Sequence, residues 1–305
     1  MANFVEHHRE GPRVVLAKGQ VAWLTKDALL RFDPSQLGEP QRVDLASPRG
    51  LAPAPVGVVA LARPSLDELV RIGDTVERQQ GLLGLTSQGV VRIWAEADGI
   101  WSVGATDIEW VPLPAPGKLF EIGRKLRLEV HGGPRAQVEV SRLADGAFVH
   151  ARGSAITRIN TDDTRQELPV PADVGLAVAI AGVGPRAWLS LRDGGLALVD
   201  LAPVRLVTCV ELGEHGHVHN FAADTSAVAV VVADQVTAGA NPVWTLRVHD
   251  NAGKQLMSVP LPWQPIAADD PELSVAIADG RVAIANAERL VVWDLATQKL
   301  LVDRH

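Results

Sequence analysis

A phrase of four short apolar segments, separated by turn residues, recurs along the 305-residue chain. Near the C-terminus it reads SVAIADG, RVAIANAE, RLVVWDLATQK and LLVDR, and three earlier phrases begin RVVLAKG, VEVSRLADG and LAVAIAG. Runs rich in Val, Leu, Ile and Trp between Gly, Asp, Asn and Pro are typical of β-strands. Four-stranded units that repeat about every 40 to 50 residues are typical of β-propeller blades. The sequence therefore predicts an all-β chain, folded as a closed β-propeller of four-stranded antiparallel blades.

An Asp or Asn closes the third segment of the phrase, where its side chain can bond the backbone of the following turn. These residues are Asp33, Asn160, Asp200, Asp250 and Asp294. Prolines recur at the ends of these phrases, at 111–114, 169–171 and 259–262. They suit the end of an outer strand, where a missing N–H costs no ladder hydrogen bond. The segment LLVDR at 300–304 completes the last blade by itself, so we expect side-chain packing to close the ring.

The segment from Ala46 to Pro134 leaves the number of blades open between seven and six. Read as two short blades, Val56–Gln79 and Gly81–Pro114, with a hairpin insertion through Leu119–Val130, it gives seven. We expect seven, because that number fits the chain length without two large insertions.

The alternative of six blades makes residues 65–79 a helix. Ser65 and Glu68 have the spacing of a capping box, and the apolar side chains that follow fall on one side, namely Leu66, Leu69, Val70 and Val76. With either number, no linker or charge block divides the chain. We therefore expect a single domain over 1–305, with residues 1–11 as an N-terminal extension.

Charge and apolar content exclude several classes of protein. The 36 acidic residues outnumber the 29 basic ones and give a net charge of −7, which disfavours nucleic-acid binding. No uninterrupted apolar stretch is long enough to span a membrane, and the N-terminus lacks the apolar core of a signal peptide. We therefore expect a cytoplasmic protein with no membrane contact. The excess of Arg over Lys and the absence of Tyr suggest a bacterial source.

The single cysteine, Cys209, excludes a disulfide framework and a cysteine-based zinc site. It lies in the apolar run RLVTCVEL, so we expect a buried, inert thiol. The serines at 141, 190 and 258 lack the G-x-S-x-G motif of a nucleophile elbow, and no phosphate-binding loop or dinucleotide fingerprint occurs. The sequence thus predicts no cofactor.

The last 90 residues or so resemble a WD-repeat propeller. Trp293–Asp294 in LVVWDLATQKL stands at the signature position, and Gly216–His217, FAAD at 221–224 and VHDNAGK at 248–254 follow the order of the same repeat. In the latter unit His249 stands where the tryptophan would be. The resemblance implies a divergent WD-repeat-like propeller, a rigid scaffold whose faces bind other molecules, most often proteins.

Histidines and paired acids offer candidate chemistry. His215, His217 and His219 alternate in EHGHVHN, but successive same-face side chains on a strand lie about 7 Å apart, too far for one tetrahedral ion. We expect no metal there and a structural role for His217. Asp162–Asp163 and Asp269–Asp270 fit ordinary turns, and His7 and His8 fit a frayed terminus.

Tryptophans supply eight of the 13 aromatic residues. Five lie inside strand phrases and are expected in the core: Trp23, Trp94, Trp188, Trp244 and Trp293. The other three, Trp101, Trp110 and Trp263, lie at phrase ends or beside prolines. Exposed Trp is enriched at binding hot spots, so these three are candidates for a protein-contact surface. The alternative is that they fill gaps between blades.

These observations favour a non-enzymatic propeller that docks a protein partner. Two alternatives remain, because propellers assemble sites from several blades and need no linear motif. One is a hydrolase or lyase with its site in the central channel. The other is a propeller that binds a small ligand or sugar in a tryptophan-lined funnel.

Overall fold

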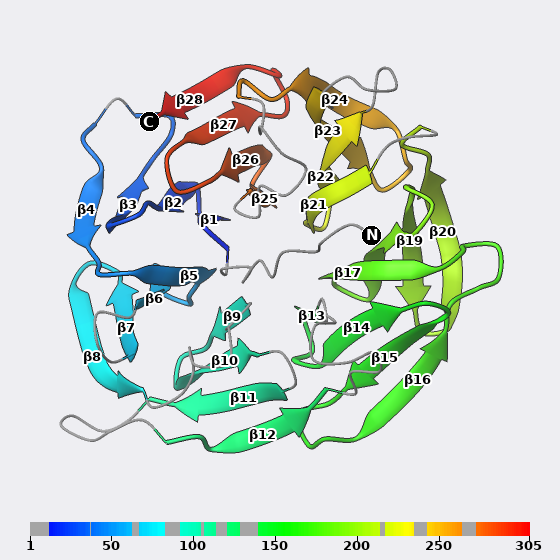
Figure 1. The fold of residues 1–305 in the computed structure, drawn as a ribbon, viewed down its shortest axis with the longest axis horizontal. Coiled ribbons are helices and arrows are strands. Elements are labelled where there is room, and N and C mark those ends of the chain that lie inside the picture. The colour runs from blue at the N-terminus through cyan, green and yellow to red at the C-terminus, as the bar shows by residue number, and fades with distance from the viewer. Residues whose placement is uncertain are drawn as a thin grey trace, which may run out of the picture.

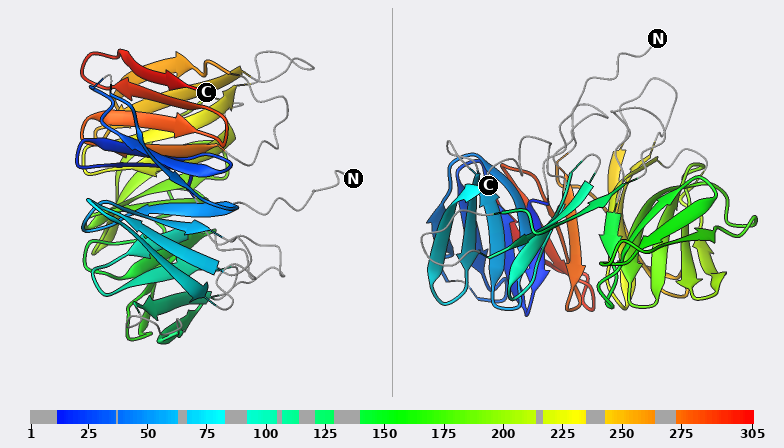
Figure 2. Two further views of the ribbon diagram at one scale, coloured as in Figure 1. Left: turned by 90° about the vertical axis from the view of Figure 1, so that its left-hand side faces the viewer. Right: turned by 90° about the horizontal axis from the view of Figure 1, so that it is seen from below.

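Seven four-stranded antiparallel sheets stand around a central axis in the computed structural model (Figure 1). The structure describes residues 12–36, 38–62, 67–82, 92–104, 107–113, 121–128, 140–213, 217–234, 243–263 and 273–305. Within these residues there are 28 strands and no helix, hence none that could cross a membrane. Side views show the blades forming a short cylinder (Figure 2). The predicted propeller is confirmed, with seven blades rather than six.

Each blade consists of four strands that are consecutive in the chain, running from the centre of the ring to its rim. Blade 1 contains β1 (Val14–Ala17), β2 (Gln20–Leu24), β3 (Ala28–Phe32) and β4 (Gln41–Asp44). Blade 2 contains β5 (Pro48–Pro53), β6 (Val58–Ala62), β7 (Asp67–Ile72) and β8 (Val76–Leu82). Blade 3 contains β9 (Arg92–Ala95), β10 (Gly99–Val103), β11 (Asp107–Pro112) and β12 (Arg124–Arg127).

The remaining four blades repeat this arrangement. Blade 4 contains β13 (Val140–Arg142), β14 (Phe148–Arg152), β15 (Ala155–Ile159) and β16 (Arg165–Pro169). Blade 5 contains β17 (Ala177–Val183), β18 (Arg186–Leu191), β19 (Leu196–Leu201) and β20 (Val204–Val210). Blade 6 contains β21 (His217–Ala223), β22 (Ala227–Asp234), β23 (Val243–Asp250) and β24 (Gln255–Pro260). Blade 7 contains β25 (Ser274–Ala278), β26 (Arg281–Ala285), β27 (Leu290–Asp294) and β28 (Leu300–Arg304).

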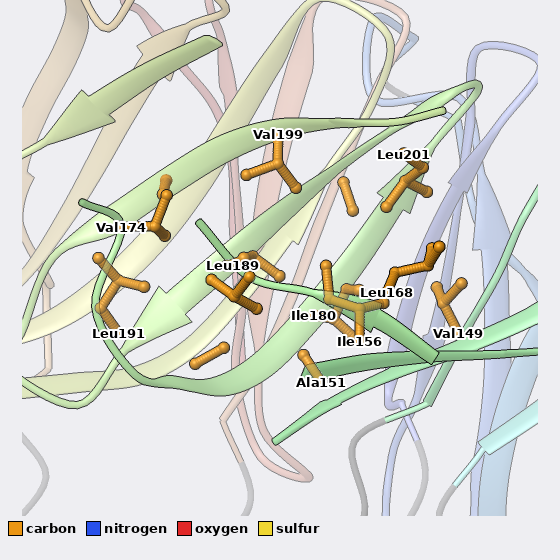
Figure 3. Packing of buried hydrophobic residues seen from close by; sticks show 14 of the residues in the cluster. Val149, Ala151, Ile156, Leu168, Val174, Ile180, Leu189, Leu191, Val199 and Leu201 are labelled. Carbon is orange, nitrogen blue, oxygen red and sulfur yellow. The ribbon is translucent and has the colours of Figure 1, made fainter. Parts of the chain in front are cut away.

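The core is divided among the seams, by which we mean the contacts between neighbouring blades. The described residues form seven clusters of buried apolar side chains, one for each seam. At the seam of blades 4 and 5, Val149, Ile156 and Leu168 face Ile180, Leu189 and Val199 (Figure 3). A middle strand therefore packs on both faces, which explains its near-continuous apolar sequence.

The helical reading of residues 65–79 is wrong for the part that the structure describes. Residues 67–72 and 76–82 are the outer strands β7 and β8 of blade 2. Val70, Leu69 and Ile72 are buried, as expected where alternating faces of a strand both meet neighbouring blades. Tertiary packing overrides the local capping signal.

The predicted hairpin insertion after residue 114 is also wrong. Residues 124–127 form β12, the outer strand of blade 3, paired with β11. Lys125 of β12 contacts the buried carboxylates of Asp107 at 3.0 Å and Glu109 at 3.1 Å. Hydrogen bonds to Asp107 and then Glu109 raise the pKa of Lys125. The proline-rich end at 111–114 accordingly closes the third strand of blade 3, whereas Pro169 and Pro260 end outer strands as predicted.

The Asx positions are confirmed, since all five lie at or next to the end of a third strand. Asp250 Oδ1 accepts backbone hydrogen bonds from Ala252 and Lys254, both at 2.9 Å, and Asp294 Oδ1 accepts one from Thr297 at 2.8 Å. Asp200 differs, because its carboxylate pairs with Arg186 and Arg205 of the same blade.

Among residues 12–305, where the structure describes them, no strand is shared between blades 7 and 1 at the closure of the ring, as the sequence predicted. Trp23 packs with Ala283 and Val292 in the cluster at this seam. Polar contacts add to it: Gly19 N donates to Asp279 at 2.9 Å, and Trp23 Nε1 donates to the carbonyl of Asn286 at 2.8 Å.

Candidate functional site

The innermost strands of all seven blades surround the central channel (Figure 1), namely β1, β5, β9, β13, β17, β21 and β25. Four antiparallel strands return the chain to the face on which a blade began, so every inner strand runs in the same direction. Their first residues gather at one face of the ring, which we call the start face. Their last residues and the turns to the second strands gather at the other, which we call the turn face.

A cavity of about 340 Å³ occupies the channel and is lined by inner-strand residues of all seven blades. We call it the central cavity. Its size is at the lower end of the range for small-molecule pockets. The polar residues of its described lining are Arg13, Arg92, Ser141, His219, Asn220 and Ser274, and none of the described lining residues is Asp or Glu.

Three of these six polar residues stand near the start face. β9 begins at Arg92, β25 begins at Ser274, and Arg13 immediately precedes β1. The guanidinium of Arg13 is buried and its Nη1 lies 3.4 Å from the carbonyl oxygen of Leu24. Arg92 Nη1 donates to the carbonyl of Val140 at 3.2 Å. Two cationic groups are thus held by backbone carbonyls around one end of the cavity.

Ser141 and Ser274 are buried in the cavity wall, and each hydroxyl oxygen accepts a backbone hydrogen bond. The N–H of Gly182 donates to Ser141 Oγ at 2.8 Å, and that of Arg13 donates to Ser274 Oγ at 2.9 Å. A hydroxyl that accepts in this way keeps its own proton for donation. Both contacts cross a seam, so they also join neighbouring blades.

A second hollow of about 530 Å³ opens on the turn face, and we call it the mouth bowl. Its apolar residues include Trp94, Pro53, Leu143 and Val183. Trp94 lines both the mouth bowl and the central cavity, and its ring contacts Phe148 edge-on with centroids 5.5 Å apart.

The charged groups of the mouth bowl have structural partners. Arg142 pairs with Glu96 of the preceding blade and lies over the ring of Trp101, 5.8 Å from its centroid. Asp224 caps its own turn by accepting from Ser226 N at 2.7 Å, and Asp279 accepts from Gly19 N. The bowl therefore combines apolar side chains with charged groups that are already bonded within the ring.

Of the three tryptophans predicted to be contact residues, Trp101 and Trp110 lie in blade 3, whereas Trp263 follows the last strand of blade 6. Trp101 is only 4% exposed and packs at the seam of blades 3 and 4, which corrects the expectation that it is exposed. Trp110 is half-buried over Gly99, where a Cβ would lie 2.4 Å from the indole. Trp263 is half-buried beneath the guanidinium of Arg289. The structure brings Trp101 and Trp110 together, with ring centroids 5.1 Å apart, but places Trp263 in a different cluster.

The histidine motif lies at the inner strand of blade 6. His215 and the side chain of His217 are outside the described residues, so the structural role of His217 stays a prediction. His219 sits in a β-bulge, lines the central cavity and contacts Trp244 edge-on at 4.7 Å. No group of three metal-ligating side chains occurs in the described part of the chain.

Of the two acidic pairs, the structure describes Asp162–Asp163. Asp162 Oδ1 accepts from the backbone and hydroxyl of Thr164, and these bonds lower the pKa of Asp162. Asp163 has a positive φ of 66° and pairs with Arg165, so this pair is turn chemistry as predicted. Asp269–Asp270, His7 and His8 lie outside the described residues.

Cys209 is exposed on the outer strand β20, which corrects the prediction of a buried thiol. The outer strand has one face at the rim of the ring, so an apolar sequence there does not imply burial. Partial desolvation, followed by Asp173, Asp193 and Glu211, still raises the pKa of this thiol.

Sequence comparison found neither a matching protein-family model nor a matching curated protein. Solved structures share the fold. Virginiamycin B lyase from Staphylococcus aureus has a TM-score of 0.58 at 14% identity, with 92% of this chain and 93% of that chain covered. Kluyveromyces lactis Hsv2 has a TM-score of 0.59 at 10% identity, with 96% and 99% covered.

A chain of the mitotic checkpoint complex has a TM-score of 0.63 at 11% identity, with 95% of this chain and 90% of that chain covered. Identities this low show the fold alone. The chain is thus a divergent WD-repeat-like β-propeller in architecture.

Proposed function

We propose that this propeller is a non-catalytic scaffold that docks a partner protein over the mouth bowl. The observation that carries the proposal is the position of Trp94, a half-buried indole that lines the mouth bowl together with Leu143 and Val183. Tryptophans in such pockets are the commonest binding hot spots, because they offer a large contact area at little entropic cost.

The fixed rim supports the same function. Arg142, Asp224 and Asp279 are each bonded within the ring, so docking would not have to order long charged side chains. The fold supports it as well, since a similar chain belongs to the mitotic checkpoint complex, a protein assembly.

The test uses two arginine substitutions of exposed alanines. Ala144→Arg places a bulky cation in the mouth bowl, whereas Ala252→Arg makes the same change at an outer turn of blade 6. Proteins that co-purify with the wild-type chain are quantified for both variants, and the partner found is then titrated by calorimetry. We expect binding to be at least about tenfold weaker for Ala144→Arg and unchanged for Ala252→Arg. Equal affinity for the two variants would refute docking at this face.

A lyase is the second candidate, and one observation favours it: His219 lines the central cavity. The staphylococcal lyase has a catalytically inactive histidine-to-alanine variant, studied with quinupristin. Incubation of this chain with quinupristin, followed by liquid chromatography, separates the two functions. We expect the substrate peak to persist, and its conversion by the wild type but not by His219→Gln would establish the lyase instead.

A further inference from the structure

We propose that the central cavity is a binding site for a small organic carboxylate with an apolar body. This site shares Trp94 with the docking surface of the mouth bowl, but it needs no partner protein. The proposal rests on the kinds of polar group in the cavity wall and on how they are distributed along the channel axis.

The end of the cavity near the start face provides cations and hydrogen-bond donors. Arg13 and Arg92 bring guanidinium groups, which match the planar geometry of a carboxylate. Ser274 Oγ already accepts the N–H of Arg13, so its hydroxyl proton is available to an acceptor. Because the two guanidinium groups carry positive charge, this end of the cavity favours an anion over a cation.

The end near the turn face is apolar. Leu16 is the third residue of β1, Ile277 the fourth of β25 and Trp94 the third of β9, so all three lie towards the ends of their strands. An anion alone would leave this surface in contact with water. A ligand with a carboxylate at one end and a hydrocarbon or aryl group at the other would fill both ends of the cavity.

Five blades provide polar residues to the cavity wall, namely Arg13, Arg92, Ser141, Asn220 and Ser274. Hydrogen bonds between neighbouring blades fix the positions of several of them. Arg13 N–H meets Ser274 Oγ across the seam of blades 7 and 1, Gly182 N–H meets Ser141 Oγ across that of blades 4 and 5, and Asn220 Nδ2 donates to Leu273 O at 2.6 Å. Polar groups held in this way lose little entropy when a ligand binds.

The first experiment is calorimetric titration of the full chain with three probes. 3-Phenylpropionate carries the proposed chemistry, 3-phenylpropionamide is its uncharged analogue, and inorganic phosphate lacks the apolar body. We expect one site for the acid and binding about ten- to a hundredfold weaker for the amide, as for hydrogen bonds to a charged group. Phosphate should bind more weakly than the acid.

The second experiment compares two arginines in similar surroundings. Arg92→Met removes a cavity guanidinium that bonds Val140 O, and Arg71→Met removes a half-buried guanidinium outside the cavity that bonds Glu96 O of the next blade. We expect Arg92→Met to weaken the acid at least about tenfold and Arg71→Met to leave it unchanged. If Arg92→Met does not fold, Ala276→Leu, which fills the cavity from β25, should abolish binding.

Three outcomes would overturn the proposal. They are the absence of saturable binding of the acid, equal affinity for acid and amide, and phosphate binding tighter than the acid. Unchanged binding by both Arg92→Met and Ala276→Leu would place the acid elsewhere on the molecule and would equally refute the site. None of these results depends on the partner protein, so the docking proposal stands or falls separately.

Discussion

The indole nitrogen of Trp23 in blade 1 donates a hydrogen bond of 2.8 Å to the backbone carbonyl of Asn286 in blade 7. Trp188 in blade 5 is equally buried, yet its indole nitrogen has no hydrogen-bond partner in the described structure. Both tryptophans lie in the second strand of their blade. Of the two, only Trp23 donates a hydrogen bond across a seam, the one between blades 7 and 1.

This difference predicts that replacing each tryptophan by phenylalanine lowers the free energy of unfolding by unequal amounts. Trp23→Phe leaves the Asn286 carbonyl unsatisfied and should lower the free energy of unfolding by about 1–3 kcal/mol more than Trp188→Phe. Denaturant titration measures both variants against the wild type. Equal losses would mean that the seam hydrogen bond adds nothing to closure.

Removal of residues 1–10 should leave the ring folded. Blades 1 and 7 each have four strands of their own, the first between residues 14 and 44 and the last between 274 and 304. We expect the melting temperature to fall by no more than a few degrees, as for a loss of about 1 kcal/mol or less. A truncated chain that fails to fold would show that these residues complete a sheet.

His249 should make the protein less stable in mild acid. Its ring is buried, Nδ1 lies 3.3 Å from the carbonyl oxygen of Gly253, and burial lowers the pKa of this histidine. The unfolded chain then binds the proton more readily than the folded one. Stability is full above the unfolded pKa of about 6.5 and falls as the pH drops from there towards the folded pKa.

The check is the difference in melting temperature between pH 7.5 and pH 5.5. It should be larger for the wild type than for His249→Phe, which cannot titrate. A His305→Phe variant, altered at the exposed C-terminal residue, should behave as the wild type. A wild-type chain whose stability is the same at both pH values would contradict the prediction.

Cys209 should react with a thiol reagent in the native protein. It is exposed on β20, so one equivalent of a maleimide should couple without denaturant. Because the thiol pKa is raised, coupling should be slow at neutral pH and should accelerate above about pH 8.5. Modification seen only after unfolding would restore the interpretation of a buried thiol.

Much of the fold follows from local chemistry that a sequence displays. The strand phrases and the Asx turns that end third strands are local, and both located the blades correctly from blade 4 onwards. Blades 2 and 3 were harder, since residues 65–79 satisfy a helical pattern as well as a strand one. Only the neighbouring blades decide between them. The outer strand β12 was predicted to belong to a hairpin insertion, because only its pairing with β11 places it in blade 3.

The candidate sites could not be predicted in the same way. Arg13, Arg92 and Ser274 are far apart in the chain and meet only because each stands where an inner strand starts. The available signal was the polar first position of an otherwise apolar first segment, as in RVVLA and SVAIA. Trp94 was expected in the core, and its second role in the mouth bowl depends on the turns of several blades.

Closure of the ring by side-chain contacts has a consequence for how the number of blades can change. Because no sheet formed by the described residues mixes strands from the two ends, the ring is a linear series of seven complete units bent into a circle. A duplication or deletion at either end would add or remove an entire blade and leave every remaining sheet whole. The sequence is therefore able to grow by whole modules, and a new number of blades changes the angle between neighbours at every seam.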